Sequence, residues 1–454
     1  MMKKKATIPT AAIVLAAGKG TRMKSTLPKV LHPVAGMPMV GHVVRNALEA
    51  GLAPITLVVA PGMDKVIDTA RDIAGEVDVG YQREQLGTAH AVLAAKDALV
   101  NFDGNLLVLY GDTPLITVET MQNVLGALAE DSQCAVAVLG FVKDEPNAYG
   151  RLVLDDEGQL ARIVEVKEAN AEELEIPLCN SGVMAIKGSV AWKLLGKIKN
   201  ENAKGEYYLT DIIELARAAG YKAVVVEGDE DEVLGVNARS ELAVAEAIFQ
   251  YRARQKHMEN GVTLVDPDSV YFAADTAIGA DTLIEPNVFF GPGVSISEKV
   301  HIKAFSHIEG AMIGKGSVVG PFARLRPGAN LGEKVKVGNF VEIKKADVKA
   351  GAKISHLSYI GDAVVGEEAN IGAGTITCNY DGYSKAITSI GRDAFIGSNT
   401  ALVAPVTVGD GAIVAAGSVI TKDVTPDALV LARSLQEEKA GWAKEFRAKQ
   451  KPKK

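Results

Sequence analysis

The sequence predicts two domains of different fold class, a Rossmann-like α/β domain followed by a parallel β-helix. In the first half, near-continuous apolar runs alternate with helix-like segments, a pattern typical of parallel strands buried on both faces. In the second half, an aliphatic residue returns about every sixth position between Ile278 and Ile420. A period of six fits neither a helix nor an alternating strand, and it indicates a solenoid with three short strands per coil. The length of 454 residues also exceeds that of one ordinary domain.

Composition and charge narrow the class of protein. A hydrophobic content of 48% and a charged content of 23% are typical of a soluble globular chain. The net charge of −7 gives no reason to expect nucleic acid as a partner, and no apolar run approaches the roughly 20 residues of a membrane span. Cys134, Cys179 and Cys378 are far apart, so they predict neither a disulfide framework nor a metal cluster, and they favour the cytoplasm.

The N-terminus superficially resembles a secretory signal, because residues 1–5 are basic and residues 11–17 are apolar. Pro9 and Thr10 interrupt this pattern, and no cleavage site of the A-x-A type precedes the glycine-rich segment. We therefore expect no export, and we interpret residues 11–15 as the first buried strand.

A glycine-rich loop follows this strand directly and reads A-A-G-K-G-T-R-M over residues 16–23. Glycine lets backbone N–H groups approach an anion, and we expect the N-terminus of the next helix to add partial positive charge. Lys19, Arg22 and Lys29 could neutralise phosphates directly. The spacing matches neither the P-loop nor the dinucleotide-binding motif, so a solvated loop is the alternative to a phosphate site.

Apolar runs at residues 55–59, 106–110 and 135–139 predict further strands, and residues 121–129 predict a helix between two of them. In doubly wound sheets, ligands bind at the carboxyl ends of the strands. The sequence Y-G-D at residues 110–112 occupies such an end. A carboxylate beside a phosphate loop indicates a hard cation such as Mg²⁺, shared between carboxylate and phosphate oxygens. The alternative is an aspartate in an ordinary turn.

A single helix is predicted between the two halves, over residues 240–258, because Ser240 can cap it and Gly261 follows its end. We interpret it as a rigid arm between the domains; a helix packed on the first domain is the alternative. The expected boundaries are 1–236 for the first domain, 237–261 for the helical linker, and 262–454 for the second domain with its C-terminal tail.

In the second half, the six-residue period places one aliphatic side chain per face in a triangular core, with glycine at the corners. Each coil buries this side chain only against its neighbours, so the array is expected to fold as a unit. The register continues over too many steps to be a coincidence. The aliphatic positions are Ile278, Ile284, Phe290, Ile296, Ile302 and Ile308, then Ile313, Val319, Leu325, Leu331, Val337 and Ile343, and finally Ile390, Ile396, Leu402, Val408, Val414 and Ile420.

Between Ile371 and Ile390 an insertion that contains T-C-N-Y-D-G-Y-S-K interrupts this register. A solenoid that tolerates an insertion places it outside the core. His356 lies two residues after a core position, so it need not be buried. Histidine is a natural general base for an amine near neutral pH; an exposed histidine without a role is the alternative. Arg326 and Lys344, also off the register, could bind a phosphate group.

Several motifs resemble those of the sugar-1-phosphate nucleotidyltransferases: L-A-A-G-K-G-T-R-M at residues 15–23, P-K at 28–29, Q-L-G-T at 85–88 and Y-G-D at 110–112. Together with the six-residue array, nearly the whole chain is similar to the bifunctional bacterial enzymes of UDP-N-acetylglucosamine synthesis. The resemblance implies an N-acetylglucosamine-1-phosphate uridylyltransferase domain. It also implies a left-handed hexapeptide-repeat domain that acetylates glucosamine-1-phosphate. Their product would feed peptidoglycan and lipopolysaccharide precursor synthesis.

For uridylyl transfer, the resemblance implies UTP as a substrate and Mg²⁺ as a cofactor. The sugar phosphate would attack the α-phosphorus in line, a reaction that depends on alignment and charge neutralisation. Gly150 could instead be a turn glycine, and Glu165 a solvated strand charge. The residues that match the nucleotide and sugar positions are Leu15, Ala16, Ala17, Gly18, Lys29, Gln82, Gly87, Thr88, Tyr110, Gly111, Asp112, Gly150, Glu165, Asn180 and Asn237. Asp112 and Asn237 match the metal ligands, and Arg22 and Lys29 match the cations that stabilise the pyrophosphate.

For acetyl transfer, the resemblance implies that His356 is the general base. We further expect Glu342 to orient it. The glucosamine amine would attack the thioester of acetyl-CoA directly, because no cysteine lies at a plausible nucleophile position. The residues that match the sugar-phosphate ligands are Arg326, Lys344, Tyr359 and Asn370. Those that match positions near acetyl-CoA are Ala373, Asn379, Tyr380, Ser398, Ala416 and Arg433.

The resemblance further implies a homotrimer with acyl-CoA sites between neighbouring protomers; the period alone indicates neither the trimer nor the handedness. The C-terminal segment from Ser434, which contains Trp442 and Phe446, would cover a neighbour's site. Two alternatives stay open: a nucleotidyltransferase whose solenoid only assembles or regulates, and an inactive sugar-nucleotide sensor. A structural solenoid needs neither His356 nor the insertion, and the intact glycine-rich loop with Asp112 speaks against a sensor.

Overall fold

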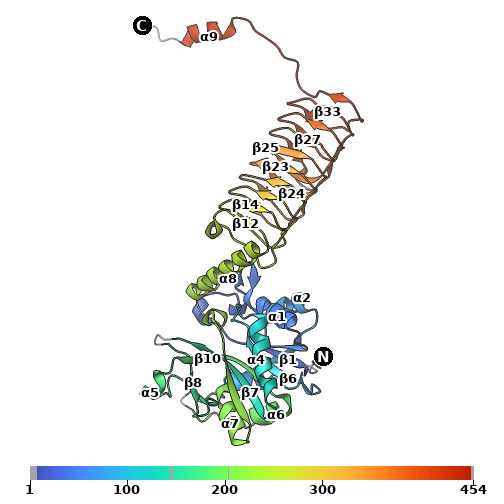
Figure 1. The fold of residues 1–454 in the computed structure, drawn as a ribbon. Helices are drawn as coiled ribbons and strands as arrows, with labels where there is room; N and C mark the ends of the chain where they lie inside the picture. The colour runs from blue at the N-terminus through green and yellow to red at the C-terminus, as the bar shows by residue number, and fades with distance from the viewer. Residues whose placement is uncertain (1–7, 144–146, 203, 451–454) are drawn as a thin grey trace, which may run out of the picture. The chain divides into compact units, whose positions relative to one another are not determined.

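The computed structural model describes residues 8–143, 147–202 and 204–450, and the chain divides into two compact units, Met1–Arg252 and Ala253–Lys454 (Figure 1). The division falls within helix α8 (Arg239–Glu259), which confirms the predicted helix. Its start differs from the prediction, because Ser240 lies inside the helix rather than at its cap. The Glu241 carboxylate instead accepts the N–H groups of Asn237 and Ala238, at 2.5 and 3.0 Å. Residues 1–5, on which the secretory-signal interpretation depended, lie outside the described residues.

The first unit is built on a mixed sheet with the strand order β11-β7-β10-β6-β1-β4-β5. The predicted runs at residues 11–15, 55–59, 106–110 and 135–139 all lie in strands of this sheet. A side hairpin of β8 (Arg151–Leu154) and β9 (Leu160–Val164) attaches to β10. The strands of the main path are β1 (Thr10–Leu15), β4 (Ile55–Val59), β5 (Asp78–Tyr81), β6 (Asn105–Tyr110), β7 (Cys134–Val142), β10 (Leu178–Ile186) and β11 (Lys222–Glu227).

One strand departs from the predicted parallel pattern. β10 runs antiparallel to both of its main-path neighbours, β6 and β7, whereas the other pairs of the main path are parallel. The apolar residues at the end of β10 are buried like those of the parallel strands. A strand buried on both faces has the same apolar composition whether it runs parallel or antiparallel to its neighbours. The sequence therefore did not reveal the antiparallel direction of β10.

Helices cover both faces of this sheet. Ala12 and Val14 of β1 belong to the core with α1, α2 and α4, whereas Ala11 and Ile13 belong to the core with α3, α6 and α7, as the alternation of side chains along a strand requires. This packing holds the strands and leaves their carboxyl ends to carry loops. The helices are α1 (Met39–Glu49), α2 (Asp64–Ala74), α3 (Thr88–Leu93), α4 (Val118–Glu130), α6 (Gly188–Leu195) and α7 (Ile212–Ala218), with the short α5 (Ala171–Leu174) outside these two cores.

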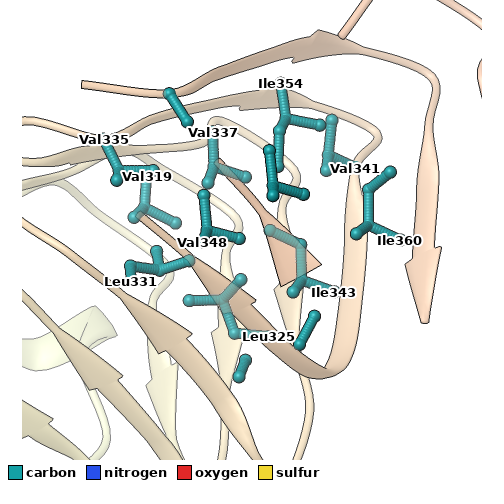
Figure 2. Packing of buried hydrophobic residues seen from close by; sticks show 14 of the residues in the cluster. Val319, Leu325, Leu331, Val335, Val337, Val341, Ile343, Val348, Ile354 and Ile360 are labelled. Carbon is teal, nitrogen blue, oxygen red and sulfur yellow. The ribbon is translucent and has the colours of Figure 1, made fainter. Parts of the chain in front are cut away.

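The second unit is a parallel β-helix, as the six-residue period predicts. In Figure 2, Val319, Leu325 and Leu331 point into the same core as residues of the following coil. The predicted aliphatic positions from Ile284 onward are buried members of this cluster, and Ile278 packs against it. Full burial of each such side chain contributes roughly 1.5–3 kcal/mol, so the coils stabilise one another along the whole array.

The walls of the β-helix are short strands that pair with their equivalents in the next coil (Figure 1). The first wall consists of β12 (Thr263–Leu264), β14 (Leu283–Ile284), β17 (His301–Ile302), β20 (Val318–Val319), β23 (Lys336–Asn339), β25 (Lys353–His356), β27 (Asn370–Ile371), β30 (Phe395–Ile396), β33 (Ile413–Val414) and β35 (Leu429–Val430). The second consists of β13 (Ala277–Ile278), β16 (Ser295–Ile296), β19 (Ala311–Ile313), β22 (Ala329–Leu331), β29 (Thr388–Ile390) and β32 (Val406–Val408). The third consists of β15 (Phe289–Phe290), β18 (His307–Ile308), β21 (Arg324–Leu325), β28 (Ile376–Cys378), β31 (Ala401–Val403) and β34 (Val419–Ile420). The long strands β24 (Glu342–Val348) and β26 (Tyr359–Val365) continue from the third wall into the second.

The predicted insertion leaves the coil between β28 and β29, and its Tyr383 is 96% exposed, so it lies outside the core as expected. After the last coil, α9 (Trp442–Gln450) gives the C-terminal segment the predicted helical character. Among the described residues, no helix combines the length and apolarity needed to cross a membrane.

Candidate active sites

A cleft of about 440 Å³ opens in the first unit where β1, β5 and β6 end. This is the sheet edge at which ligands of α/β folds bind. The predicted residues that line it are Leu15, Ala16, Ala17, Gly18, Lys29, Gln82, Gly87, Thr88, Tyr110, Asp112 and Glu165. Six further residues line the cleft but were not among the site residues expected from the sequence: Val30, Gln85, Ala91, Lys204, Glu206 and Tyr208.

The glycine-rich loop is held against this cleft. Gln85 donates from Nε2 to the carbonyl of Ala17 at 2.6 Å. Gly20 has a φ of 61°, and a Cβ on it would lie 2.5 Å from Cβ of Lys29. Only glycine therefore lets the loop pass so close to the lysine. The loop ends of β1 and β6 are also joined, because Gly111 donates its N–H to Leu15 O at 2.9 Å.

The expected helix N-terminus behind the loop is absent, and this prediction was wrong. The loop continues into two single turns, η1 (Thr21–Met23) and η2 (Lys29–Leu31), and α1 begins only at Met39. Pro28 disfavours helical conformation in the residue before it, which keeps the two turns separate. Lys19 and Arg22 are exposed and do not line the cleft, whereas Lys29 does.

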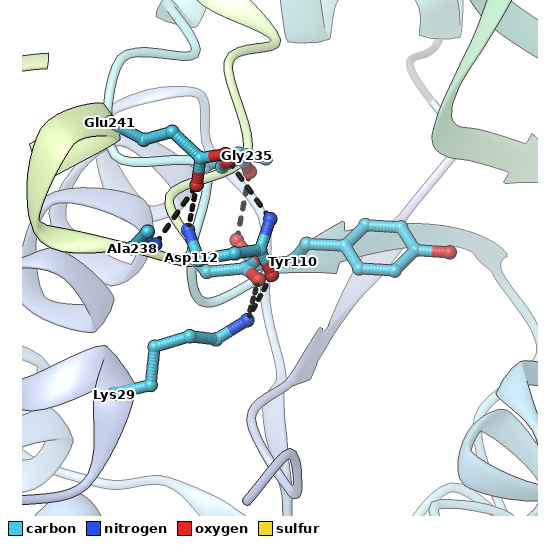
Figure 3. Close-up of polar contacts among 8 residues, drawn as sticks. Lys29, Tyr110, Asp112, Gly235, Ala238 and Glu241 are labelled. Carbon is cyan, nitrogen blue, oxygen red and sulfur yellow. Dashed lines mark hydrogen bonds and ion pairs between the residues drawn. The ribbon is translucent and has the colours of Figure 1, made fainter. Parts of the chain in front are cut away.

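Lys29 and Asp112 line the cleft, and Figure 3 shows the side chain of Lys29 pointing toward Asp112. Asn237 contacts the same lysine but does not itself line the cleft. Lys29 Nζ donates to Oδ2 of Asp112 and, at 3.0 Å, to Oδ1 of Asn237. The amide of Asn237 is fixed from behind, since its Nδ2 donates to Gly235 O at 3.1 Å. Val236 donates its N–H to Asp112 O at 2.9 Å, which joins the two segments.

This arrangement fits a hard cation. Two oxygens from distant segments converge on a single positively charged atom, and carboxylate and amide oxygens are suitable ligands for Mg²⁺. The remaining ligands of such an ion are water and substrate phosphate in nucleotide-binding sites. Asp112 and Asn237 each direct an oxygen at Lys29 Nζ, and their assignment as metal ligands stays a prediction.

The three predicted sugar residues also lie together. Asn180 on β10 donates its N–H to Gly150 O at 2.8 Å, and a Cβ on Gly150 would lie 3.8 Å from Oε1 of Glu165. Burial raises the pKa of Glu165, and Glu168 and Glu206 raise it further against the opposing charge of Lys204. Glu165 is thus a partly buried wall of the cleft rather than a solvated strand charge.

In the second unit, the predicted base and three acetyl-CoA positions lie in one column along a corner of the β-helix. The residue after each one donates its N–H to the equivalent residue one coil earlier: Leu357 to Asn339 O, Gly374 to His356 O, Asn399 to Ala373 O and Gly417 to Ser398 O, at 2.7–3.2 Å. Ala416 continues the column, and Arg433 Nη1 donates to its carbonyl at 3.0 Å. Residues far apart in sequence are thus stacked coil on coil.

His356 is exposed, as predicted, but its partner is not the expected one. Its Nδ1 lies 2.6 Å from Oδ1 of Asn339. Glu342, which was expected to orient it, instead accepts from Arg326 Nη1 at 2.8 Å and lies 3.7 Å from Arg324. The expectation for Glu342 was therefore wrong, because β24 places that carboxylate on the third wall, opposite Arg324 on β21.

Cations gather near the insertion. Lys344 lies beside Lys385 of the insertion, and this contact together with the charge of Lys385 lowers the pKa of Lys344. Arg326 adds a further positive charge. Adjacent ammonium groups repel unless an anion lies between them, so the cluster suits a phosphate. The neighbouring Asn379 donates from Nδ2 to Asp362 Oδ2, and Tyr380 is 59% exposed.

The other sugar-phosphate candidates are divided between walls. Tyr359 begins β26 on the third wall and pairs with Glu342 and Ile376. Asn370 begins β27 on the first wall and pairs with Lys353 and Phe395.

Two residues of this region were missed from sequence, and each carried a signal. Asn339 precedes His356 by one coil of 17 residues, so aligning the coils would have placed it beside the histidine. Lys385 closes the insertion motif but was read only as part of it. In the first unit, no sequence repeat could have placed Lys204, Glu206 and Tyr208 beside the cleft.

Two family models match the chain. The MobA-like NTP transferase domain matches residues 12–170, and the hexapeptide repeat of succinyl-transferase matches residues 387–422. The first lies on the mixed sheet that carries the cleft. The second lies on the last coils, and it accords with a left-handed parallel β-helix.

Curated proteins resemble the chain over almost its whole length. The protein named bifunctional protein GlmU of Paramagnetospirillum magneticum is 57% identical over 446 residues, covering 98% of both chains. That of Rhodospirillum rubrum is 55% identical over 439 residues, covering 97% of both. That of Zymomonas mobilis is 50% identical over 445 residues, covering 98% of this chain and 99% of its own.

Proposed function

The chain belongs to the family of bifunctional GlmU proteins, and on that premise we propose how its residues divide two reactions. The enzyme acetylates glucosamine-1-phosphate from acetyl-CoA. It then transfers a uridylyl group from UTP to N-acetylglucosamine-1-phosphate, which yields UDP-N-acetylglucosamine and pyrophosphate. We propose domain boundaries at 1–236, 237–261 and 262–454. In support, the contact division at Arg252 and Ala253 lies inside the proposed linker.

The first domain carries uridylyl transfer. Residues 15–18, with Gln82, Gly87 and Thr88, hold the uridine and its phosphates, and Gly150, Glu165 and Asn180 hold the sugar. The sugar phosphate oxygen attacks the α-phosphorus in line as pyrophosphate leaves. Lys29 neutralises charge on the leaving group, because a fixed cation at the cleft wall needs no reorganisation during the reaction. Arg22, exposed on η1, would complete this role when the nucleotide is present.

Asp112 and Asn237 are the proposed Mg²⁺ ligands. When bound, the ion would supply a positive charge shared between carboxylate and phosphate oxygens. The contact of both residues with Lys29 keeps their oxygens directed at one point before substrates arrive.

The second domain carries acetyl transfer. His356 accepts a proton from the glucosamine amine, which then attacks the thioester carbonyl and releases CoA. Arg326 and Lys344 bind the sugar phosphate together with Tyr359 and Asn370. The column of Ala373, Ser398 and Ala416, with Asn379, Tyr380 and Arg433, supplies the acetyl-CoA site.

A homotrimer completes that site. An apolar ridge of Phe305, Phe322, Phe340 and Leu357 follows the corner of successive coils just before the small corner residues Gly374, Asn399 and Gly417 begin. Its phenylalanine rings stack at 4.9 and 5.3 Å between centroids, and each member is 46–62% exposed. Positive φ is common at the corners of this β-helix, as at Lys299, Lys334 and Glu368, so the distinctive feature of the ridge is its exposed apolar surface. We propose that the ridge packs on a second copy, and that Trp442 and Phe446 of α9 reach a neighbour's site.

We also propose that the enzyme works in the cytoplasm. Cys134, Cys179 and Cys378 are all free thiols, and the first two are buried, an arrangement that a reducing compartment preserves.

The convergence of Lys29, Asp112 and Asn237, coded more than 200 residues apart at the extremes, is the single observation that carries the proposal. The purified protein should be assayed with glucosamine-1-phosphate, acetyl-CoA, UTP and Mg²⁺, with CoA and pyrophosphate followed separately. We expect CoA release without UTP or Mg²⁺, and pyrophosphate release only after acetylation and only with a divalent metal. Pyrophosphate release that is insensitive to chelation would contradict the metal assignment.

A further inference from the structure

The amide of Gln82 is held in one orientation at the back of the first cleft. Gln82 follows β5 directly and is 5% exposed. Its Nε2 lies 3.1 Å from the carbonyl oxygen of Gly87 and 3.3 Å from Nδ1 of His90. A carbonyl oxygen only accepts, so Gly87 favours the amide nitrogen on its side, but this single contact uses only one of the two hydrogens of Nε2.

The second hydrogen of Nε2 is directed at His90. An amide nitrogen has no lone pair to offer, so Nδ1 of His90 must be the acceptor, and the ring carries its proton on Nε2. Both hydrogens of the Gln82 amide are thereby used. Within the described part of the chain, no donor contacts its oxygen Oε1, and Gln82 lines the cleft. Oε1 of Gln82 is therefore available to accept a hydrogen bond from a ligand in the cleft.

The two groups that hold Gln82 are themselves fixed by Tyr207. Tyr207 donates its N–H to Leu86 O at 2.7 Å and accepts the N–H of Ala89 at 3.0 Å, which pins the segment that contains Gly87. A Cβ on Gly87 would lie 2.5 Å from Tyr207 O, so the segment can pass there only as glycine. The ring of Tyr207 lies 6.4 Å from that of His90, tilted by 32°.

We propose that His90 is a positioning residue that sets base selectivity by fixing the Gln82 amide with its oxygen toward the nucleotide. An outward carbonyl oxygen selects a pyrimidine with an N–H at ring position 3, as uracil has, over cytosine, which has a lone pair there. A reversed amide would offer N–H to the base and favour cytosine. The inference rests on the proposed uridylyl transfer, and it adds a role for a histidine that the reaction itself does not require.

The test compares UTP with CTP in the wild-type enzyme and two variants. His90→Phe keeps a flat ring against Tyr207 but removes the acceptor. We expect the ratio of kcat/KM for UTP over CTP to fall by about tenfold, the scale of one misaligned hydrogen bond. His90→Asn can place its Oδ1 near the position of Nδ1, so it should keep a ratio close to that of the wild type.

A merely structural histidine would give a different result, because its loss would lower both nucleotide activities together. An unchanged UTP/CTP ratio in His90→Phe overturns the inference, and so does a collapse of the ratio in a well-folded His90→Asn. Acetyl transfer, which uses the other domain, reports that each variant is intact; His90→Leu replaces His90→Phe if the latter does not fold. A wild-type enzyme that releases no pyrophosphate from UTP would overturn the proposed function first, and the inference with it.

Discussion

At the scale of single residues, the partner of His356 determines how well it acts as a base. Asn339 Oδ1 accepts a hydrogen bond from Nδ1 at 2.6 Å, which leaves Nε2 of a neutral ring as the acceptor for a proton. We expect Asn339→Ala to lower kcat of acetyl transfer by about tenfold, and His356→Ala to lower it by roughly 10²–10⁴. CoA release by the purified variants measures both. Glu342→Gln removes the negative charge from the contact with Arg326 instead, so it should act on KM for the sugar phosphate. A kcat loss equal to that of Asn339→Ala would contradict this assignment.

Another single residue gives the first unit a pH dependence. His42 on α1 donates from Nε2 to Val34 O at 2.9 Å, and burial lowers its pKa to about 4. The unfolded chain binds this proton near pH 6.5, so between pH 6.5 and pH 4 the unfolded state holds more protons than the folded one. The stability supplied by neutral His42 is therefore complete above pH 6.5 and declines as the pH falls.

We expect the unfolding free energy to drop by about 2 kcal/mol through His42 between pH 7.5 and pH 5. His42→Gln keeps a donor for Val34 O without a titrating group, so its stability should change less over that interval. Thermal unfolding at both pH values measures the difference. Equal decreases in Tm for the two proteins would show that other groups carry the acid sensitivity.

A site residue could be predicted from the sequence when its own side-chain chemistry indicated a role. His356 and Asp112 stood out because their chemistry is specific and their surroundings in the sequence are regular. Asn339 was missed because its role depends on His356, one coil later. Lys385 was missed because its role depends on Lys344, on a strand two coils before the one that the insertion follows. Glu342 was assigned to the wrong partner because closeness in sequence does not reveal which wall of the β-helix carries a side chain. It lies on the third wall, where it contacts Arg326.

At the scale of elements, the β-helix was predictable residue by residue and the α/β sheet was not. Each coil repeats the same local rule, so the buried positions from Ile284 to Ile420 follow from the period. The direction of β10 and the missing helix after the glycine-rich loop depend on how the chain returns to the sheet, and neither leaves a local pattern. The strands themselves were predicted because buried apolar runs need no tertiary information.

The apolar ridge is the element through which the oligomer can be tested. We expect Phe322→Glu to dissociate the trimer, because a carboxylate in an apolar contact has no partner for its charge. Acetyl transfer should fall with it while uridylyl transfer persists. Light scattering after size-exclusion chromatography measures the mass. Phe395→Glu is the matched control, since Phe395 is 47% exposed on the same β-helix but lies outside the ridge. A Phe322→Glu protein of unchanged mass would rule the ridge out as the contact.

At the scale of the whole molecule, two sites on separate compact units should act independently. Asp112→Ala removes an oxygen from the proposed metal site and should lower uridylyl transfer by a hundredfold or more, on the order of what one aligned charge contributes. His356→Ala should remove only acetyl transfer. Each variant supplies the step that the other lacks, and the acetylated sugar phosphate is a small soluble molecule.

An equimolar mixture of these two variants should therefore form UDP-N-acetylglucosamine from glucosamine-1-phosphate, acetyl-CoA and UTP. Pyrophosphate should appear after a lag, because the intermediate must first leave one protein and accumulate in solution. The lag should shorten when more of the Asp112→Ala protein, which makes the intermediate, is added. A mixture that stays inactive although each variant keeps its single activity would mean that the intermediate is not exchanged through solution, and the two units would then have to be treated as one catalytic device.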